Sequence, residues 1–408
     1  MVKSINKITI LNIASTILLQ GIAFFTIPIF TKMLGAEQYG IYSVFNSWVA
    51  ILTCIMGFSI GSSLGTGRYE FKDTYYSFRS SILLFGTLIS IVIISIGIIF
   101  IEPISTYLKY SYELVFLMLL SAFAHFVVNF IQSACIYEKR AELNFAISVI
   151  LSVVTVVLSI ILINQFAKEN RFMGRIYGMT VPYIFIAIIV WLLFFLKKPT
   201  SLHRNYCKYS LMMGFPIVFH SLSQNVLSQS DRVMMQSFAI SNAEIGIYSL
   251  FYSLVAVMNT ILGALNNSWC PFYYDDLDSK NWKKLKYKCR NYIELFTVII
   301  IGFLLLSREV SYLLADSEYW EGINIIPILV LGVFFTFMYQ FPVNFEFFHK
   351  KTQIIAMGTV GSGILNILLN AIMIPKWGMY GAAIATTISY GTLFLVHYII
   401  VTHMKEEK

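Results

Sequence analysis

The sequence predicts an all-α integral membrane protein, with twelve transmembrane helices in two parallel six-helix lobes around a central cavity. Of its 408 residues, 58% are hydrophobic and only 12% are charged, and the mean hydropathy is +0.73. A soluble domain carries roughly 25% charged residues, so this composition is typical of a protein embedded in lipid. Apolar runs of about 20 residues, the length that crosses ~30 Å of hydrocarbon as a helix, recur along the whole chain.

The twelve expected spans follow one another with short connections. In chain order they cover 8–31, 41–66, 81–101, 114–136, 143–166, 176–196, 210–236, 245–267, 291–307, 323–345, 354–374 and 379–401. The first run is too long for a cleavable signal peptide and lacks a small-residue cleavage site, so we expect a spanning helix there. The polar, basic segment 197–209 connects the sixth and seventh helices. It predicts an N-terminal lobe over 1–205 and a C-terminal lobe over 206–408.

The basic residues predict that both termini lie inside the cell. With an inside N-terminus, 21 of the 29 Lys and Arg residues fall in inner segments and 8 in outer ones. This split follows the positive-inside rule. The net charge of +8 is therefore a topology signal, and no nucleic-acid partner is needed to explain it. The five cysteines have no metal-ligand spacing, so we expect no disulfide, no metal and no cofactor.

Two segments repeat each other at a displacement of half the chain. Segment 39–50 reads YGIYSVFNSWVA and segment 245–256 reads IGIYSLFYSLVA, so eight of twelve positions are identical 206 residues apart. One interpretation is chance similarity between two apolar helices. The favoured one is a duplicated module, because parallel repeats of this kind build transporters with a pathway between their halves.

The loops offer little room for catalysis. The sequence contains no phosphate-binding GxxxxGK[ST] motif. The acidic cluster of Asp275, Asp276 and Asp278 is interpreted as a solvated turn rather than a metal and nucleotide-diphosphate site. The longest loop, 270–292, is either a short amphipathic helix capped by Ser279 on the inner leaflet or a solvated basic loop. An enzyme acting on lipid-linked sugars would need a larger loop, so we expect a transporter and not an enzyme.

Polar residues in the seventh helix are the main candidates for binding. Ionisable groups at membrane depth are costly and tend to face a cavity. Asp231 and Arg232 are followed by further apolar sequence, so the pair is expected inside the helix. His220, Gln224 and Asn225 precede it as hydrogen-bonding groups. The alternative is that these polar groups only hold neighbouring helices together.

Candidate gate residues lie near the ends of the predicted helices. Lys32 ends the first helix and is a further binding candidate. Pro28 and Pro216 predict kinks in the opening helices of the two halves. Arg68 and Arg308 lie at the inner and outer mouths, where they are equally well explained as ordinary basic residues that reach toward the interface.

Several of these motifs together resemble a known family. The chain is similar to the polysaccharide and O-antigen flippases, which belong to the superfamily of multidrug, oligosaccharidyl-lipid and polysaccharide exporters. The similar segments are Pro28 with KMLGAEQYGIY at 32–42, GFP at 214–216, Asp231-Arg232, EIGIY at 244–248 and NSWCPFY at 267–273. Each motif is weak alone, but together they occupy the expected places in both halves.

The resemblance implies transport of an undecaprenyl-diphosphate-linked oligosaccharide repeat unit, from the inner to the outer leaflet of the bacterial cytoplasmic membrane, by alternating access. In that function Arg232 would bind the diphosphate and Asp231 would orient the Arg232 side chain. Lys32 would assist from the other lobe. The polar groups of the seventh helix would bind the sugars. A polysaccharide polymerase and a chain-length regulator are the implied protein partners.

Differences from related families narrow the range of possible substrates. Flippases for the peptidoglycan precursor carry arginines along the first helix and two additional helices, whereas here the first helix has no arginine and twelve helices are expected. We therefore expect O-antigen units first, and capsular or other exopolysaccharide units next. The alternative is a cation-coupled drug or metabolite antiporter of the same superfamily. That branch usually shows acidic residues at mid-depth in the first six helices, and this sequence has none there.

Overall fold

The computed structural model describes residues 2–197 and 201–406, and the regular structure in these residues is helical throughout. The long helices are α1 (Val2–Ile55), α3 (Tyr75–Ile99), α5 (Tyr112–Tyr137), α6 (Ala141–Gln165), α7 (Arg171–Lys197), α8 (Arg204–Ser237), α9 (Asn242–Asp278), α10 (Trp282–Leu314), α11 (Ile326–Phe348) and α12 (Thr352–Glu406). The short ones are η1 (Met56–Ser63), α2 (Leu64–Glu70), η2 (Lys72–Thr74), α4 (Ile101–Leu108), η3 (Lys168–Asn170) and η4 (Ser317–Ile325). The predicted all-α fold is confirmed.

The multi-pass membrane character is also confirmed. Among the described residues, eight helices are long and apolar enough to cross a membrane. Two of the long helices, α1 and α12, each contain more than one predicted span. Each has a break in its interior, at Gly35 (φ 74°) in α1 and at Gly378 (φ 53°) in α12. Glycine adopts these left-handed angles without the steric cost that a side chain would add. The count of twelve crossings and the inside position of both termini stay predictions.

The second predicted span, 41–66, is not one regular helix. It changes to the 3₁₀ segment η1, where Gly57, Phe58 and Ser59 all have positive φ. A Cβ atom on Gly57 would lie 2.3 Å from the Phe126 ring of α5. The ring therefore approaches the backbone of η1 so closely that only a glycine fits at this point.

Of the two interpretations of segment 270–292, the helical one is confirmed and the solvated loop is wrong, because only residues 279–281 lie between two helices. Helix α9 continues to Asp278 and α10 begins at Trp282. Lys280 takes the left-handed conformation (φ 51°) that ends α9. The cap of α10 is Asn281, whose side chain accepts from the Lys284 N–H at 3.1 Å, and not the expected Ser279.

The acidic cluster at the end of α9 has a structural ion pair at its centre. Asp276 is buried, and its carboxylate pairs with Lys288 and, at 3.5 Å, with Lys284 of α10. The interpretation of this cluster as a solvated turn is therefore wrong for Asp276. The predicted apolar span ends at residue 267, whereas α9 continues to Asp278. The ion pairs of Asp276 lie in this additional part of the helix.

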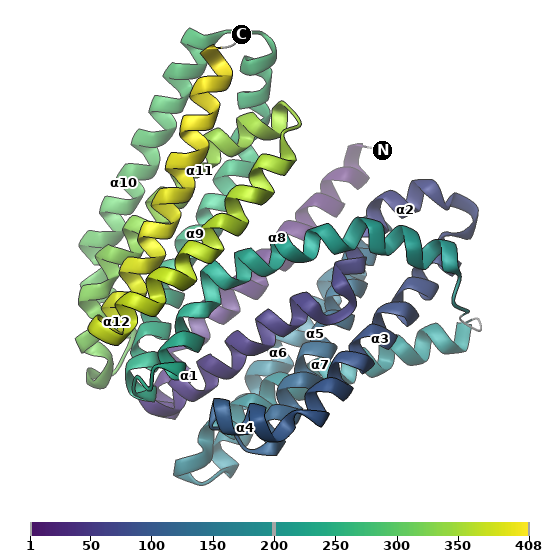
Figure 1. The fold of residues 1–408 in the computed structure, drawn as a ribbon, viewed down its shortest axis with the longest axis vertical. Coiled ribbons are helices and arrows are strands. Elements are labelled where there is room, and N and C mark those ends of the chain that lie inside the picture. Colours follow the sequence, from purple (N-terminus) through teal and green to yellow (C-terminus); the bar gives the residue numbers. More distant parts are fainter. Residues whose placement is uncertain (1, 198–200, 407–408) are drawn as a thin grey trace. The chain divides into compact units, whose positions relative to one another are not determined.

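The chain forms two compact units, and it passes between them inside helices. The first unit comprises residues 1–26 and 41–225, and the second comprises residues 27–40 and 226–408. In the first unit, α7 packs against α5 and α6, and α3 packs against η1. In the second unit, α9, α10, α11 and α12 run lengthwise beside one another (Figure 1). A division of the protein into lobes at residue 205, within a linker of which residues 198–200 lie outside the described residues, stays a prediction.

The repeated glycine has the same physical role in both copies of the repeat. Within the second unit, a Cβ atom on Gly40 would lie 1.8 Å from the Asn242 carbonyl oxygen. Reciprocally, a Cβ on Gly246 would lie 2.0 Å from the carbonyl oxygen of Ala36. The two helices therefore cross backbone against backbone, as helices do in membranes where small residues occur four apart.

Candidate functional site

The centre of the candidate site is a polar cluster around Asp231, in the second unit. Asp231 lies in α8 and is completely buried. Its Oδ2 accepts hydrogen bonds from the Tyr248 hydroxyl of α9 and, at 2.8 Å, from the Thr386 hydroxyl of α12. Its Oδ1 accepts from Asn370 Nδ2 at 2.7 Å. Three donors from two helices thus satisfy a carboxylate that would be very costly to bury alone.

A second layer of amides closes this cluster. Asn366 lies one turn before Asn370 in α12, and its Oδ1 accepts from Asn370 Nδ2 at 3.1 Å and from the Ser230 hydroxyl at 2.9 Å. Its Nδ2 donates to Thr386 Oγ1 at 3.3 Å. Since Asn366 and Thr386 lie on opposite sides of the break at Gly378, the network also joins the two halves of α12.

Arg232 has a different set of partners from its neighbour Asp231. Its Nε donates to the Ser249 hydroxyl at 3.0 Å, and its Nη1 donates to the Ser228 carbonyl at 2.9 Å and to Gln229 Oε1 at 3.3 Å. Its guanidinium also lies over the ring of Tyr252, 4.4 Å from the centroid. These hydrogen-bond acceptors are all neutral, so the hydrogen bonds hold the side chain in place without neutralising its charge.

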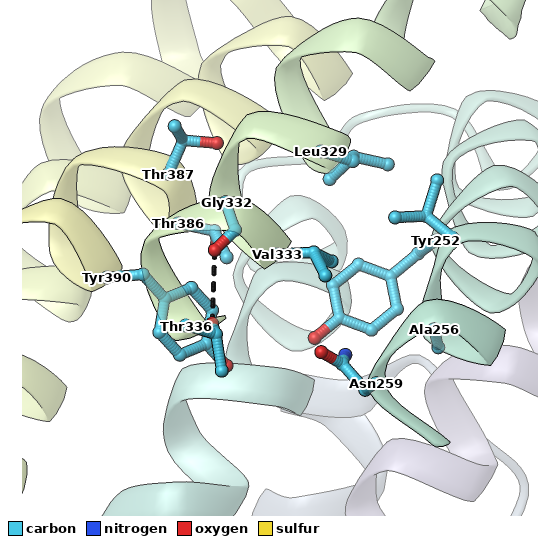
Figure 2. Close-up of a pocket in the computed structure, with 11 residues that line it drawn as sticks. Tyr252, Ala256, Asn259, Leu329, Gly332, Val333, Thr336, Thr386, Thr387 and Tyr390 are labelled. Atoms are coloured by element: carbon cyan, nitrogen blue, oxygen red, sulfur yellow. Dashed lines mark hydrogen bonds between the residues drawn. The ribbon is translucent and has the colours of Figure 1, made fainter. Parts of the chain in front are cut away.

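A small cavity lies beside this cluster, among α9, α11 and α12. It has a volume of about 20 Å³, which is room for a single water-sized molecule. Figure 2 shows the Tyr252 and Tyr390 rings and the Asn259 amide at its wall, with Thr336 donating to the Gly332 carbonyl at 3.0 Å. Both polar and apolar side chains line the cavity, and it is too small for a sugar in this conformation.

The other predicted binding residues lie apart from the cluster in the chain. His220, Gln224 and Asn225 are half-buried and belong to the part of α8 that packs in the first unit. Asn225 donates to Cys54 Sγ at 3.1 Å and to the Ser221 carbonyl at 3.0 Å. Asn225 therefore bonds within the first unit, whereas Asp231 and Arg232 bond within the second.

Lys32 belongs to the second unit. Its Nζ lies 3.9 Å from Asp316 Oδ1, and about half of each side chain is exposed. An exposed pair of this length is worth little to stability, so it leaves Lys32 available for other contacts.

The candidate gate residues are located at helix ends and inside helices. Arg68 donates to the Tyr137 carbonyl, and the exposed Arg308 donates from Nε to the Tyr312 hydroxyl at 3.0 Å. Pro28 and Pro216 lie inside α1 and α8, and the break in α1 falls at Gly35 and not at the proline. The sequence-based role of these four residues in gating stays a prediction.

Two further parts of the polar interior lie outside the predicted binding residues. Asn366 and Asn370 lie four residues apart in an apolar helix, and that spacing, NILLN, would have been a sufficient signal. Glu346 and His397 are both fully buried, and His397 Nδ1 lies 2.8 Å from both carboxylate oxygens. Because they lie 51 residues apart in α11 and α12, only the tertiary structure brings them together.

Comparisons with known proteins agree with this architecture. Residues 5–273 match the family described as polysaccharide biosynthesis protein. One similar curated protein is a probable low-salt glycan biosynthesis flippase, Agl15, from Haloferax volcanii, 23% identical over 93% of this chain and 80% of that protein. Another is an uncharacterized membrane protein from Haemophilus influenzae, 23% identical over 88% of this chain and 90% of that protein.

Solved structures share the fold. An inward-facing multidrug resistance MATE family transporter of the MOP superfamily superposes with a TM-score of 0.74 at 16% identity, covering 95% of both chains. The lipid II flippase MurJ in an inward closed conformation superposes with a TM-score of 0.69 at 18% identity, covering 95% of this chain and 87% of that one. Together with the family match, these findings confirm the resemblance inferred from the sequence motifs.

Proposed function

We propose that this chain, which belongs to the polysaccharide biosynthesis protein family, is a flippase that moves lipid-linked oligosaccharides across the membrane. The observation that carries the proposal is the buried Arg232, whose hydrogen bonds within the described part of the chain go to neutral acceptors. A permanent cation at membrane depth is costly unless it serves an anion or a structural pair. The family supplies the anion in chemical terms, because its glycans are carried on lipid diphosphates.

In this proposal Arg232 binds the diphosphate. Arg presents a planar set of donors that match phosphate oxygens, and charge-assisted hydrogen bonds are about twice as strong as neutral ones. Phosphate oxygens would therefore displace neutral acceptors such as Ser249 and Gln229 as the site opens to substrate. Asp231 acts on Arg232 through the backbone, because its bonds to α9 and α12 hold this part of α8 in place. Lys32 assists with its exposed ammonium group.

The proposed substrate is an undecaprenyl-diphosphate-linked repeat unit. O-antigen is the first candidate for this unit, and capsule or another exopolysaccharide is the next. It moves from the inner to the outer leaflet of the bacterial cytoplasmic membrane by alternating access. His220, Gln224 and Asn225 are the proposed sugar-binding groups of α8. A polymerase and a chain-length regulator would receive the product.

The alternative is a cation-coupled antiporter of drugs or metabolites. It is favoured by the fully buried Asp231, since a carboxylate at membrane depth is typical of ion-coupled transport. The two functions differ in what a deletion strain loses. Trapped lipid-linked units with absent surface polysaccharide support the flippase, whereas normal polysaccharide with altered drug sensitivity would support the antiporter.

Complementation of that strain tests the site. We expect Arg232→Ala to abolish surface polysaccharide at normal protein level, and Arg232→Lys to retain part of it, because a point charge still attracts a diphosphate. Arg290→Ala is the matched control, since Arg290 is 78% exposed and pairs only with Glu294 in its own helix. Full activity of Arg232→Ala would remove this residue from the mechanism.

A further inference from the structure

A second cavity lies in the first unit. It is a groove of about 680 Å³ between α3, α6 and α7. This volume lies within the range of sites that bind small molecules, roughly 300–1,000 Å³. One end of the groove is polar and the remainder is apolar, so its occupant should be amphipathic.

The polar end carries two guanidinium groups and a carboxylate that pairs with both of them. Arg79 is 12% exposed, pairs with Glu138 and lies over the Phe194 ring at 4.7 Å. Arg140 is 54% exposed, and its Nη1 lies 3.9 Å from Glu138 Oε2. Two guanidinium groups therefore share one carboxylate. Hydrogen-bonding groups of Ser77, Ser80 and His203 line the same end.

The apolar body of the groove extends over one leaflet. Its walls include large side chains that are partly exposed on the outer faces of the helices: Leu143, Ile150, Phe185, Ile189 and Leu193. From Arg140 to Ile150 the chain advances ten residues along α6, which is about 15 Å at the helical rise. This depth is half of the ~30 Å hydrocarbon core of a bilayer.

We propose that this groove is a binding site for one anionic glycerophospholipid, with an acyl chain along the apolar body and the phosphodiester at Arg140. By the predicted topology the site faces the inner leaflet. The charge of the lipid headgroup distinguishes a phospholipid from a diphosphate-linked lipid. A phosphodiester carries one negative charge, which balances the excess of one guanidinium group over the Glu138 carboxylate, whereas a diphosphate carries at least two. The groove is therefore separate from the binding site of the transport substrate. This inference does not depend on the proposed function.

Native mass spectrometry of the purified full-length chain tests this proposal. The probes are phosphatidylglycerol, zwitterionic phosphatidylethanolamine, undecaprenyl diphosphate and inorganic phosphate. We expect one phosphatidylglycerol to be retained about fivefold more strongly than phosphatidylethanolamine, the effect of one basic residue near a membrane surface. Arg140→Ala should remove this preference, Arg140→Lys should keep it, and the exposed Arg290→Ala should leave it unchanged.

Several results would overturn the proposal. These are equal retention of the two phospholipids, an unchanged preference in Arg140→Ala, displacement by inorganic phosphate alone, or displacement by equimolar undecaprenyl diphosphate. If Arg140→Ala does not fold, Ile150→Trp decides the question, because it fills the apolar body at a position that is 52% exposed and leaves the ion pairs intact. We expect weaker phosphatidylglycerol retention in that variant, because the larger side chain occupies the space of the acyl chain, and wild-type retention would refute the groove as the site.

Discussion

At the scale of single residues, adjacent side chains on α8 have different hydrogen-bond partners, although both contact α9. Successive residues of a helix point about 100° apart, so Asp231 and Arg232 reach different neighbours. Asp231 meets a hydroxyl of α9 and the amide and hydroxyl groups of α12, whereas Arg232 meets Ser249 and the carbonyl side of its own helix. Asp231 thus bonds to groups of α9 and α12, whereas the hydrogen bonds of Arg232 go to neutral acceptors in α8 and α9.

The role of Asp231 in holding α8 leads to a stability prediction. Asp231→Asn keeps the size of the side chain, but its amide would direct hydrogens at groups that already donate. We expect the free energy of unfolding to fall by about 1–3 kcal/mol, as when buried donors lose their acceptor. Thermal unfolding in detergent measures it, with the exposed Asp278→Asn as control. Equal melting temperatures of Asp231→Asn and the wild type would show that the carboxylate is not what holds these helices.

At the scale of elements, glycines determine where helices break and where they touch. Gly378 lies eight residues from both Asn370 and Thr386, so the break in α12 brings these two side chains to the same carboxylate. Glu244 of α9 accepts the Met379 N–H at 2.7 Å and so satisfies the backbone at this break. Gly40 and Gly246 serve the other purpose, because they allow backbones to meet.

The crossing of α1 and α9 gives a test with an internal control. Gly246→Ala places a Cβ 2.0 Å from a carbonyl oxygen, so the two helices must move apart. We expect a loss of about 1–3 kcal/mol in unfolding free energy, in the range of overpacking. Gly263→Ala lies in the same helix with nothing within 4 Å of the new atom, and should be neutral or stabilising by up to about 1 kcal/mol.

Thermal unfolding of the two variants measures the difference. If Gly246→Ala and Gly263→Ala are equally stable, the close approach of α1 and α9 is not a constraint on the fold.

At the scale of the whole molecule, the chain passes between its two units inside α1 and α8. The boundaries fall at 26/27, 40/41 and 225/226, so parts of both opening helices pack in a different unit from the sequence that adjoins them. If the units move during transport, these helices must carry the movement. Pro28 lies two residues after the first boundary, where the missing backbone hydrogen bond makes a helix easier to bend.

Alternating access predicts that water reaches the polar face of α8. In a variant without native cysteines, we expect Ser228→Cys to react with a water-soluble maleimide and to be protected by bound lipid-linked oligosaccharide. Leu227→Cys is the control, because the Leu227 side chain is fully buried one position earlier. Mass spectrometry counts the labelled fraction. If Ser228→Cys stays as unreactive as Leu227→Cys under all conditions, α8 does not line a wet pathway.

Much of this protein was predictable from local patterns. Apolar runs of about 20 residues predicted the helical fold, because a helix satisfies its own backbone whatever surrounds it. The polar run ending at Asp231 and Arg232 predicted a candidate site in α8, because ionisable groups at membrane depth are costly and tend to face a cavity or a partner. The motifs around the repeated Gly-Ile-Tyr-Ser segment predicted the family. These features depend on neighbours in the chain, so a single sequence contains them.

Only the tertiary structure decided which side chains meet. Nothing local to Asp231 indicates that Tyr248, Asn370 and Thr386 donate to it, and nothing local to Glu346 indicates His397. The ends of α9 and α10 also extended past the apolar pattern because Asp276 and its lysines pair across a turn. Burial makes an unpaired polar group costly, but many partners can satisfy the same group. The partner is chosen by how the helices pack, and that choice is made over the whole chain at once.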